Sequence, residues 1–224
     1  MALTDKLGAI GAAIRSKTGK TDLLTLEEMP AEIEGIMSGA SGDIDTFLSA
    51  IEGIEPFSIS AADIYGITAL RECAFMYCDN ITAIDIPATV TTLGNRIFMQ
   101  CTNLESITIP SSVKQISQNL CYGCSSLVSV VLSPSAHTIA DSAFRDCTSL
   151  VSIEIPASVM SIGGYAFNGC SSLKTIKVLR ETPPTISSNS FPSVNYLEKI
   201  IVPAGCASAY KEKWSNYASI ITEV

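Results

Sequence analysis

The sequence predicts an α/β, β-rich solenoid of about six coils of 23 residues each, preceded by a small α-helical module. The first observation is a set of cysteines that recur every 23 residues: Cys78, Cys101, Cys124, Cys147 and Cys170. Self-similarity at a fixed period of 20–50 residues is the signature of a solenoid. The second observation is composition, because 47% of the 224 residues are hydrophobic and only 16% are charged. This balance excludes a disordered chain.

Other positions repeat with the same period. We number slots relative to the recurring cysteine, which occupies slot 0 of each coil. Apolar residues fill slots −8, +3, +6 and +8, and slot −3 holds Phe75, Phe98, Cys121, Phe144 and Phe167. A sixth coil fits with one inserted residue, and it places Phe191 in slot −3 and Val194 in slot 0.

Each coil divides into two halves. Slots +3 to +9 alternate apolar residues with period 2 and end in Pro87, Pro110 or Pro156. This pattern predicts a short strand that stops at proline, which has no N–H to donate. The other half is expected to turn back through a short strand and a helical turn. No coil buries its apolar face alone, so the coils must stack and both ends must be capped.

The chain before the repeats is predicted to be helical. Residues 1–37 form a module in which Leu3, Leu7, Ile10 and Ile14 follow a heptad-like spacing. Residues 38–42 read Ser-Gly-Ala-Ser-Gly and predict a flexible linker. The solenoid domain then spans 43–224. It begins with an amphipathic cap helix over 43–56 and ends with a cap over 204–224.

The repeat I-P-x-S/T-V-x-x-I-x-x-x-A-F-x-x-C-x-x-L-x-x-I-x-I-P resembles the BspA-type leucine-rich repeats, over residues 57–224. Residues 182–185, 201–205 and 209–217 also resemble the C-terminal segments of that family. The resemblance implies a right-handed leucine-rich-repeat solenoid used for adhesion or recognition on bacterial surfaces, with no enzymatic chemistry.

Residues 3–36 resemble a short module of tail-associated proteins from phages and prophages of gut bacteria. That likeness implies attachment to a virion or another assembly, or homo-oligomerisation. The alternative is a helical hairpin that packs on the solenoid, since a segment this short cannot form a stable core alone.

The cysteines allow more than one interpretation. Neighbouring coils bring cysteines close enough for disulfides, and clustered thiols can also bind metal. All five ladder cysteines occupy one inward slot, which Val194 shares, so we expect free buried thiols that fill space. Cys121 and Cys124 form a C-x-x-C pair, which in another context indicates redox activity. Here Cys121 fills the phenylalanine slot, which favours packing.

No other motif indicates catalysis, and we expect no catalytic residue, metal ligand or cofactor. His137 is the single histidine, and a catalytic triad or zinc site needs more partners. We therefore expect it on the surface. Asp141 and Asp146 are expected to be solvated acids, and Gly163-Gly164 lies at a coil turn without a phosphate-binding helix.

Charge and hydropathy limit the partners. The net charge of −8 argues against nucleic acid, whose phosphates require clusters of basic residues. No apolar run of about 18 residues exists, so membrane insertion is not expected. The N-terminus lacks signal-peptide features. An extracellular, cell-surface or virion location then requires another export route or a removed leader, and a cytoplasmic location stays open.

The outward slots +5 and +7 of the predicted strands form the candidate binding face, as a continuous concave sheet. Its residues are Asp85, Ser106, Thr108, Ser129, Val131, Ser152, Glu154, Thr175, Lys177 and Lys199. The strip changes from acidic to basic along the rod, and its hydroxyl groups suit weak multivalent contacts, for example with glycans. An ordinary solvated sheet face is the alternative, since aromatic anchors are lacking.

The sequence thus predicts a non-enzymatic recognition or adhesion module. It would bind a protein or glycan through a solenoid face, at a bacterial cell surface or on a phage tail. The alternative is a structural spacer without a specific ligand.

Overall fold

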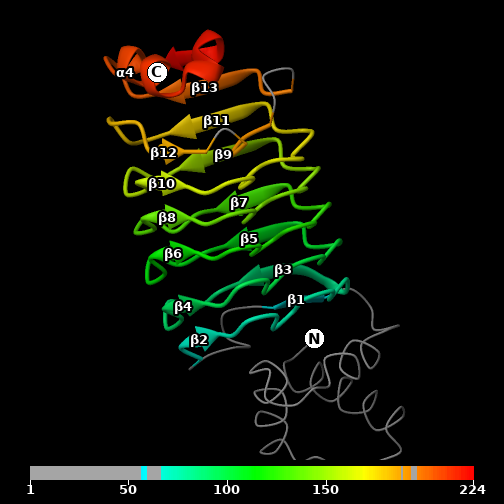
Figure 1. Cartoon of the computed structure of the whole chain (residues 1–224). Helices are drawn as coiled ribbons and strands as arrows, with labels where there is room; N and C mark the ends of the chain where they lie inside the picture. The colour runs from blue at the N-terminus through cyan, green and yellow to red at the C-terminus, as the bar shows by residue number, and fades with distance from the viewer. Residues whose placement is uncertain (1–56, 60–66, 188, 193–195) are drawn as a thin grey trace, which may run out of the picture.

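Stacked coils form a parallel β-solenoid, shown from the side in Figure 1. The computed structural model describes residues 57–59, 67–187, 189–192 and 196–224. The predicted helical module, the linker, the cap helix over 43–56 and Val194 lie outside these residues.

One side of the stack is built from the longer strands, and we call it the long-strand face. Its strands are β1 (Phe57–Ile59), β3 (Ile81–Asp85), β5 (Ser106–Thr108), β7 (Ser129–Val131), β9 (Ser152–Ile155), β11 (Thr175–Val178), β13 (Lys199–Val202) and β14 (Ile221–Glu223). They pair in parallel in two sheets of four, β1-β3-β5-β7 and β9-β11-β13-β14. The alternation follows the prediction, because slots +6 and +8 point inward, as Ile107 and Ile109 show.

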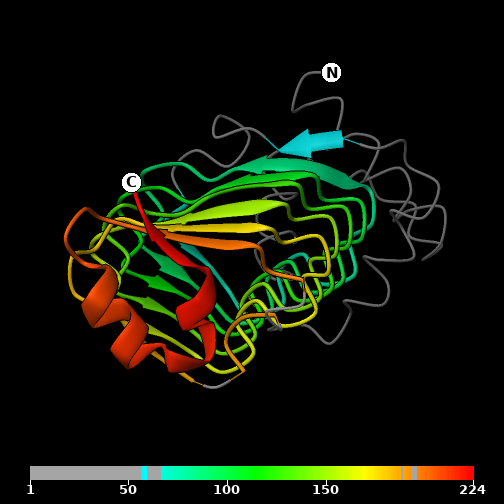
Figure 2. The same cartoon turned by 90° about the horizontal axis from the view of Figure 1, so that it is seen from above.

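A second side carries strands of two residues each. These are β2 (Ala69–Leu70), β4 (Thr92–Leu93), β6 (Gln115–Ile116), β8 (Thr138–Ile139), β10 (Ser161–Ile162) and β12 (Thr185–Ile186). They form the sheets β2-β4 and β6-β8-β10-β12. Figure 2, seen from above, shows the long strands along one side of the coils and the short strands along another.

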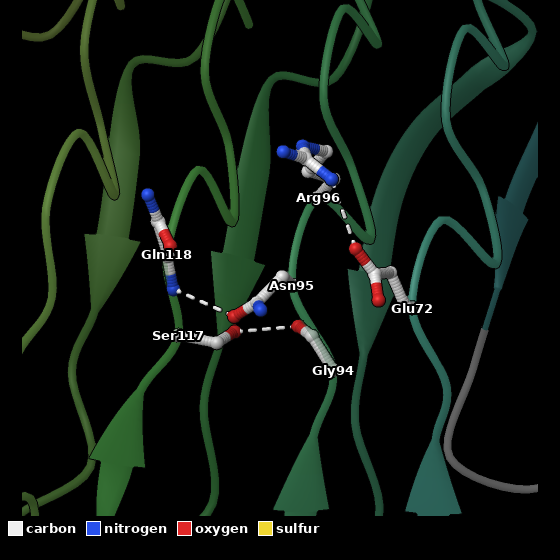
Figure 3. Close-up of polar contacts among 6 residues, drawn as sticks. All are labelled: Glu72, Gly94, Asn95, Arg96, Ser117 and Gln118. Carbon is white, nitrogen blue, oxygen red and sulfur yellow. Dashed lines mark hydrogen bonds and ion pairs between the residues drawn. The ribbon is translucent and has the colours of Figure 1, made fainter.

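Side chains connect the coils where the short-strand sheet is interrupted between β4 and β6 (Figure 3). The buried Ser117 donates its hydroxyl to the Gly94 carbonyl at 2.7 Å. The Asn95 side-chain oxygen accepts the Gln118 backbone N–H at 3.3 Å. These side chains link the two coils at the step where the short strands do not pair.

Between slots −7 and 0 the chain follows a third side, which we call the turn edge. In the first four coils, slots −5, −3 and −1 donate their backbone N–H to the next coil, as Ser142 does to the Gly164 carbonyl at 2.8 Å. The slots between them donate within their own turn, as Arg145 does to the Ser142 carbonyl at 3.2 Å. This alternation satisfies the buried backbone without helix or strand.

The helical turn expected in this half of the coil is not a regular helix, because slots −5 and −1 adopt positive φ. Those residues are Cys73, Tyr77, Arg96, Gln100, Asn119, Gly123, Ser142, Asp146, Tyr165 and Gly169. A left-handed residue interrupts helical hydrogen bonding and costs a non-glycine residue about 1–2 kcal/mol. The left-handed conformation directs the backbone N–H of these residues toward the neighbouring coil.

The core is a set of residue ladders parallel to the stack. Phe75 stacks on Phe98 with ring centroids 5.5 Å apart, and Phe144 stacks on Phe167 at the same distance. Cys121 interrupts this ladder, as the sequence predicted. All three of Cys121, Phe98 and Phe144 are fully buried.

The C-terminal segment covers the last coil (Figure 1). It comprises α4 (Ala207–Lys213), the 3-10 helix η1 (Ser215–Ile220) and β14. The buried Trp214 donates its indole N–H to the Pro184 carbonyl at 2.9 Å and packs against Phe191. This arrangement has the geometry of the expected cap, but β14 also extends the long-strand sheet, which the sequence did not indicate.

The predicted six coils are confirmed, each with one short and one long strand, from β2–β3 to β12–β13. The structure adds β1 before them and β14 after them, both paired in parallel with the outermost coils. The long-strand sheets therefore extend one strand beyond the repeat at each end.

Candidate recognition face

The structure brings all ten predicted binding residues onto the long-strand face. Slot +5 residues Ser106 and Ser129 are register partners, and so are Thr108 and Val131 in slot +7. In the second sheet Lys177 is paired with Glu154 in the same way. The predicted positions thus form two continuous rows within each sheet.

Charged pairs link neighbouring coils on this face. Lys177 Nζ lies 2.8 Å from Glu154 Oε2, and Lys174 Nζ lies 3.1 Å from Glu198 Oε1. All four side chains are at least 43% exposed, so each pair contributes little to stability, about 0–1 kcal/mol. Their effect is to hold long side chains in defined positions on the face.

Three exposed valines lie around the middle of the face, and we call them the valine patch: Val131 within β7, and Val128 and Val151 directly before β7 and β9. Val128, Val131 and Val151 are 55%, 53% and 53% exposed. The face predicted from the sequence includes Val131 but not Val128 and Val151, which occupy slot +4 of adjacent coils. The available signal was that slot +4 holds polar or charged residues elsewhere: Thr82, Glu105, Lys174 and Glu198.

The valine patch lies where the long-strand sheet is interrupted. Among the described strands, β7 and β9 belong to separate sheets although they occupy successive coils. The break follows the one coil exit among the first four that lacks proline in slot +9. There the buried Ser133 donates its hydroxyl to the Val113 carbonyl instead.

The ladder cysteines are structural in their geometry. All five are buried and unbridged in the structure. Cys101, Cys124, Cys147 and Cys170 each place Sγ 2.9–3.1 Å from the carbonyl of the slot −3 residue one coil earlier. Each thiol therefore gives a second hydrogen bond to a carbonyl that already accepts a backbone N–H, as well as filling space.

Burial also determines the reactivity of these thiols. It raises the pKa of Cys78 to about 12 and raises the pKa of Cys101, Cys121 and Cys147 well above the usual thiol value. A reactive cysteine needs an exposed thiolate of lowered pKa. Cys121, the first residue of the C-x-x-C pair, has the opposite properties.

The remaining candidate groups have structural roles or face solvent. His137 is exposed, as predicted. Asp141 is exposed and accepts the Gly164 N–H at 2.7 Å. A side chain at Gly163 would overlap Asp141, so that glycine permits close approach of two coils.

Within the described part of the chain, no group of three or more His, Cys, Asp or Glu side chains could hold a metal ion. None of its helices is long and apolar enough to cross a membrane.

With the coil geometry established, the comparisons with known proteins identify the repeat. The family model for the BspA type leucine rich repeat region matches residues 68–198 and 137–223, with six copies. This chain belongs to the BspA-type leucine-rich repeat family. Members of this family commonly mediate protein interaction or adhesion and are typically surface proteins.

Solved structures of bacterial leucine-rich repeat proteins share the fold. One from Bacteroides ovatus is 27% identical, with a TM-score of 0.58, and the match covers 77% of this chain and 43% of that chain. One from Eubacterium ventriosum is 32% identical, with a TM-score of 0.51, covering 57% of this chain and 34% of that chain. The chain thus spans less than half the length of either protein.

No curated protein matches the chain. The family match begins at residue 68, so the likeness of residues 3–36 to phage tail modules stays a prediction.

Proposed function

We propose that this BspA-type solenoid is a non-enzymatic recognition module that binds a protein partner through the long-strand face. The proposed location is a bacterial cell surface or a phage tail, with residues 3–36 providing attachment. The single observation that carries the proposal is the valine patch, an exposed apolar centre on a face lined mostly by polar groups.

This arrangement has the anatomy of a protein interface. Interfaces combine a desolvated apolar core with a polar rim. Here Val128, Val131 and Val151 would form the core. The rim contains Thr108, Ser129, Ser152 and the Lys177–Glu154 pair. Scattered single apolar residues on a surface are ordinary, whereas three on adjacent coils form a patch that a partner can cover.

The test measures binding of the fluorescently labelled chain to intact gut bacteria and to immobilised host glycoproteins. A Val128→Ser, Val151→Ser double variant should lose at least about tenfold in affinity, or about 1.4 kcal/mol. The matched control is Val224→Ser, since Val224 is 80% exposed and lies outside the patch. It should bind like the unchanged chain.

Two results would contradict the proposal. If the double variant binds as tightly as the unchanged chain, the valine patch is not the recognition site. If the unchanged chain binds no cell or glycoprotein, either as a monomer or clustered on beads, the structural spacer becomes the better account.

The attachment proposal has a separate test. If Leu7 and Ile14 belong to an association seam, a Leu7→Glu, Ile14→Glu variant should sediment as a smaller species than the unchanged chain. A Lys6→Glu, Lys17→Glu variant, outside the heptad-like seam, controls for added negative charge. Identical sedimentation of all three proteins would show that the seam does not drive self-association.

A further inference from the structure

A cluster of two tyrosines and an arginine lies on the turn edge, outside the long-strand face. The Arg145 guanidinium carbon lies 5.4 Å from the ring centroid of Tyr122 and 5.3 Å from that of Tyr165. The three residues come from three successive coils. We call them the turn-edge cluster.

The arginine is held between the rings but is not neutralised by a strong ion pair. Its Nε is buried and has no hydrogen-bond partner among the described residues. Asp146 Oδ2 lies 3.6 Å from that nitrogen, beyond hydrogen-bond range. The Arg145 side chain is 39% exposed, so the outer part of the guanidinium is open to a ligand.

Tyr165 contributes exposed aromatic surface at a conformationally costly position. It is 43% exposed and has a φ of 59°. At the left-handed backbone of slot −5, asparagine, as in Asn119 of another coil, is more favourable than tyrosine. A large ring that is nearly half exposed adds little to the core, while its left-handed backbone costs conformational energy. We therefore expect Tyr165 to have a role other than packing.

The charges around the cluster select the class of ligand. Asp141 and Asp146 lie in the same coil as Arg145, and the whole chain carries a net charge of −8. These negative charges would repel an anionic ligand. A neutral ligand with many hydroxyl groups can instead donate to the carboxylates and accept from the guanidinium.

We propose that the turn-edge cluster binds a neutral pyranose residue of a glycan. One face of a pyranose presents C–H groups that pack on a tyrosine ring, while its hydroxyls meet Arg145 and the aspartates. Three side chains match the size of one sugar, whereas a stable protein interface buries about 800 Å² on each partner. Such a site binds in the millimolar range and acts through multivalent display.

The test is saturation-transfer NMR of the full chain with methyl glycosides of glucose, galactose and mannose, and with glucuronate as an anionic probe. At least one neutral glycoside should bind. Tyr165→Asn, which suits the left-handed backbone, and Arg145→Gln should each weaken that binding at least tenfold. Tyr77→Asn is the matched control, because Tyr77 is 49% exposed on the same edge with a φ of 63°. It should leave binding unchanged.

Several results would overturn the inference. These are no binding of any neutral glycoside, binding that the Tyr165 and Arg145 variants do not change, or a salt-sensitive preference for glucuronate, which would indicate an anion site. The inference does not rest on the valine patch. The Val128→Ser, Val151→Ser variant should keep glycoside binding, so failure of one proposal is distinguishable from failure of the other.

Discussion

At the scale of single residues, the buried thiols make the stability of the solenoid depend on pH. Burial raises the pKa of Cys78 to about 12 and that of Cys101 well above the ordinary thiol value. Between the unfolded and folded pKa values the native state holds more protons than the unfolded state. Stability from these groups is therefore complete below about pH 8.5, the unfolded thiol pKa, and is lost as pH rises toward the folded value.

We expect the free energy of unfolding in urea to fall steadily between pH 8.5 and pH 10.5. A Cys101→Ala variant should show a shallower decline, since burial raises the pKa of that thiol and the substitution removes it. Ser111→Ala, at an exposed serine, should show the full decline. A stability that is flat across this range would show that the ladder thiols are not shielded.

Thiol reactivity provides a second check on the same residues. In the native protein, Ellman's reagent should react with no more than the two half-buried thiols, Cys73 and Cys206. The six buried ones should react only after denaturation. Rapid native reaction of all eight would be incompatible with a buried ladder.

A substitution at Ser117 measures how much a side-chain hydrogen bond between two coils contributes to stability. Ser117→Ala removes the donor to the partly buried Gly94 carbonyl (Figure 3) and should cost about 1–2 kcal/mol in urea unfolding. Ser111 is exposed in the same coil, so Ser111→Ala should change stability by less than about 0.5 kcal/mol. Equal effects of the two substitutions would refute the role given to Ser117.

At the scale of elements, the distance between stacked turns determines which glycines can be replaced by a larger residue. A Cβ at Gly94 would overlap the backbone nitrogen of Glu72, while one at Gly164 would meet nothing nearer than 3.8 Å. Gly94→Ala should therefore destabilise the protein by about 1–3 kcal/mol. Gly164→Ala, on the same edge, should be nearly neutral, and thermal unfolding of both variants measures the difference.

The elements that the sequence could predict are those that repeat. Slots −3, 0, +6 and +8 face the core in nearly every coil, so their apolar identity recurs and locates the strands. Val130 is an exception, because it occupies slot +6 but is only half-buried. It lies in β7, beside the break between the two long-strand sheets.

Contacts that occur once could not be predicted in this way. The position of Arg145 between two rings depends on Tyr122 in slot −2 of one coil and Tyr165 in slot −5 of another. Neither slot is aromatic elsewhere among the cysteine-marked coils. The valines at slot +4 were missed for a related reason, since that slot carries no apolar consensus.

At the scale of the whole molecule, stability is a sum over the coils and the interfaces between them. A substitution at one end should therefore destabilise mainly the coils next to it. Trp214 closes the last coil, and Trp214→Ala should cost about 3–5 kcal/mol locally. Hydrogen exchange should show faster exchange in residues 185–202 than in the unchanged protein, with residues 104–150 little affected. Tyr196→Ala, at an exposed tyrosine, is the control, and uniform loss of protection would indicate a single cooperative unit instead.

The alternating donors of the turn edge have a consequence for how such a protein can change in length. Each of the first four coils offers the same set of N–H groups to its successor, whose carbonyls accept them at an unchanging register. A duplicated 23-residue unit would therefore dock at an internal junction using bonds that already exist on both sides. Growth by duplication would lengthen the exposed faces and leave the chemistry of every other coil in place.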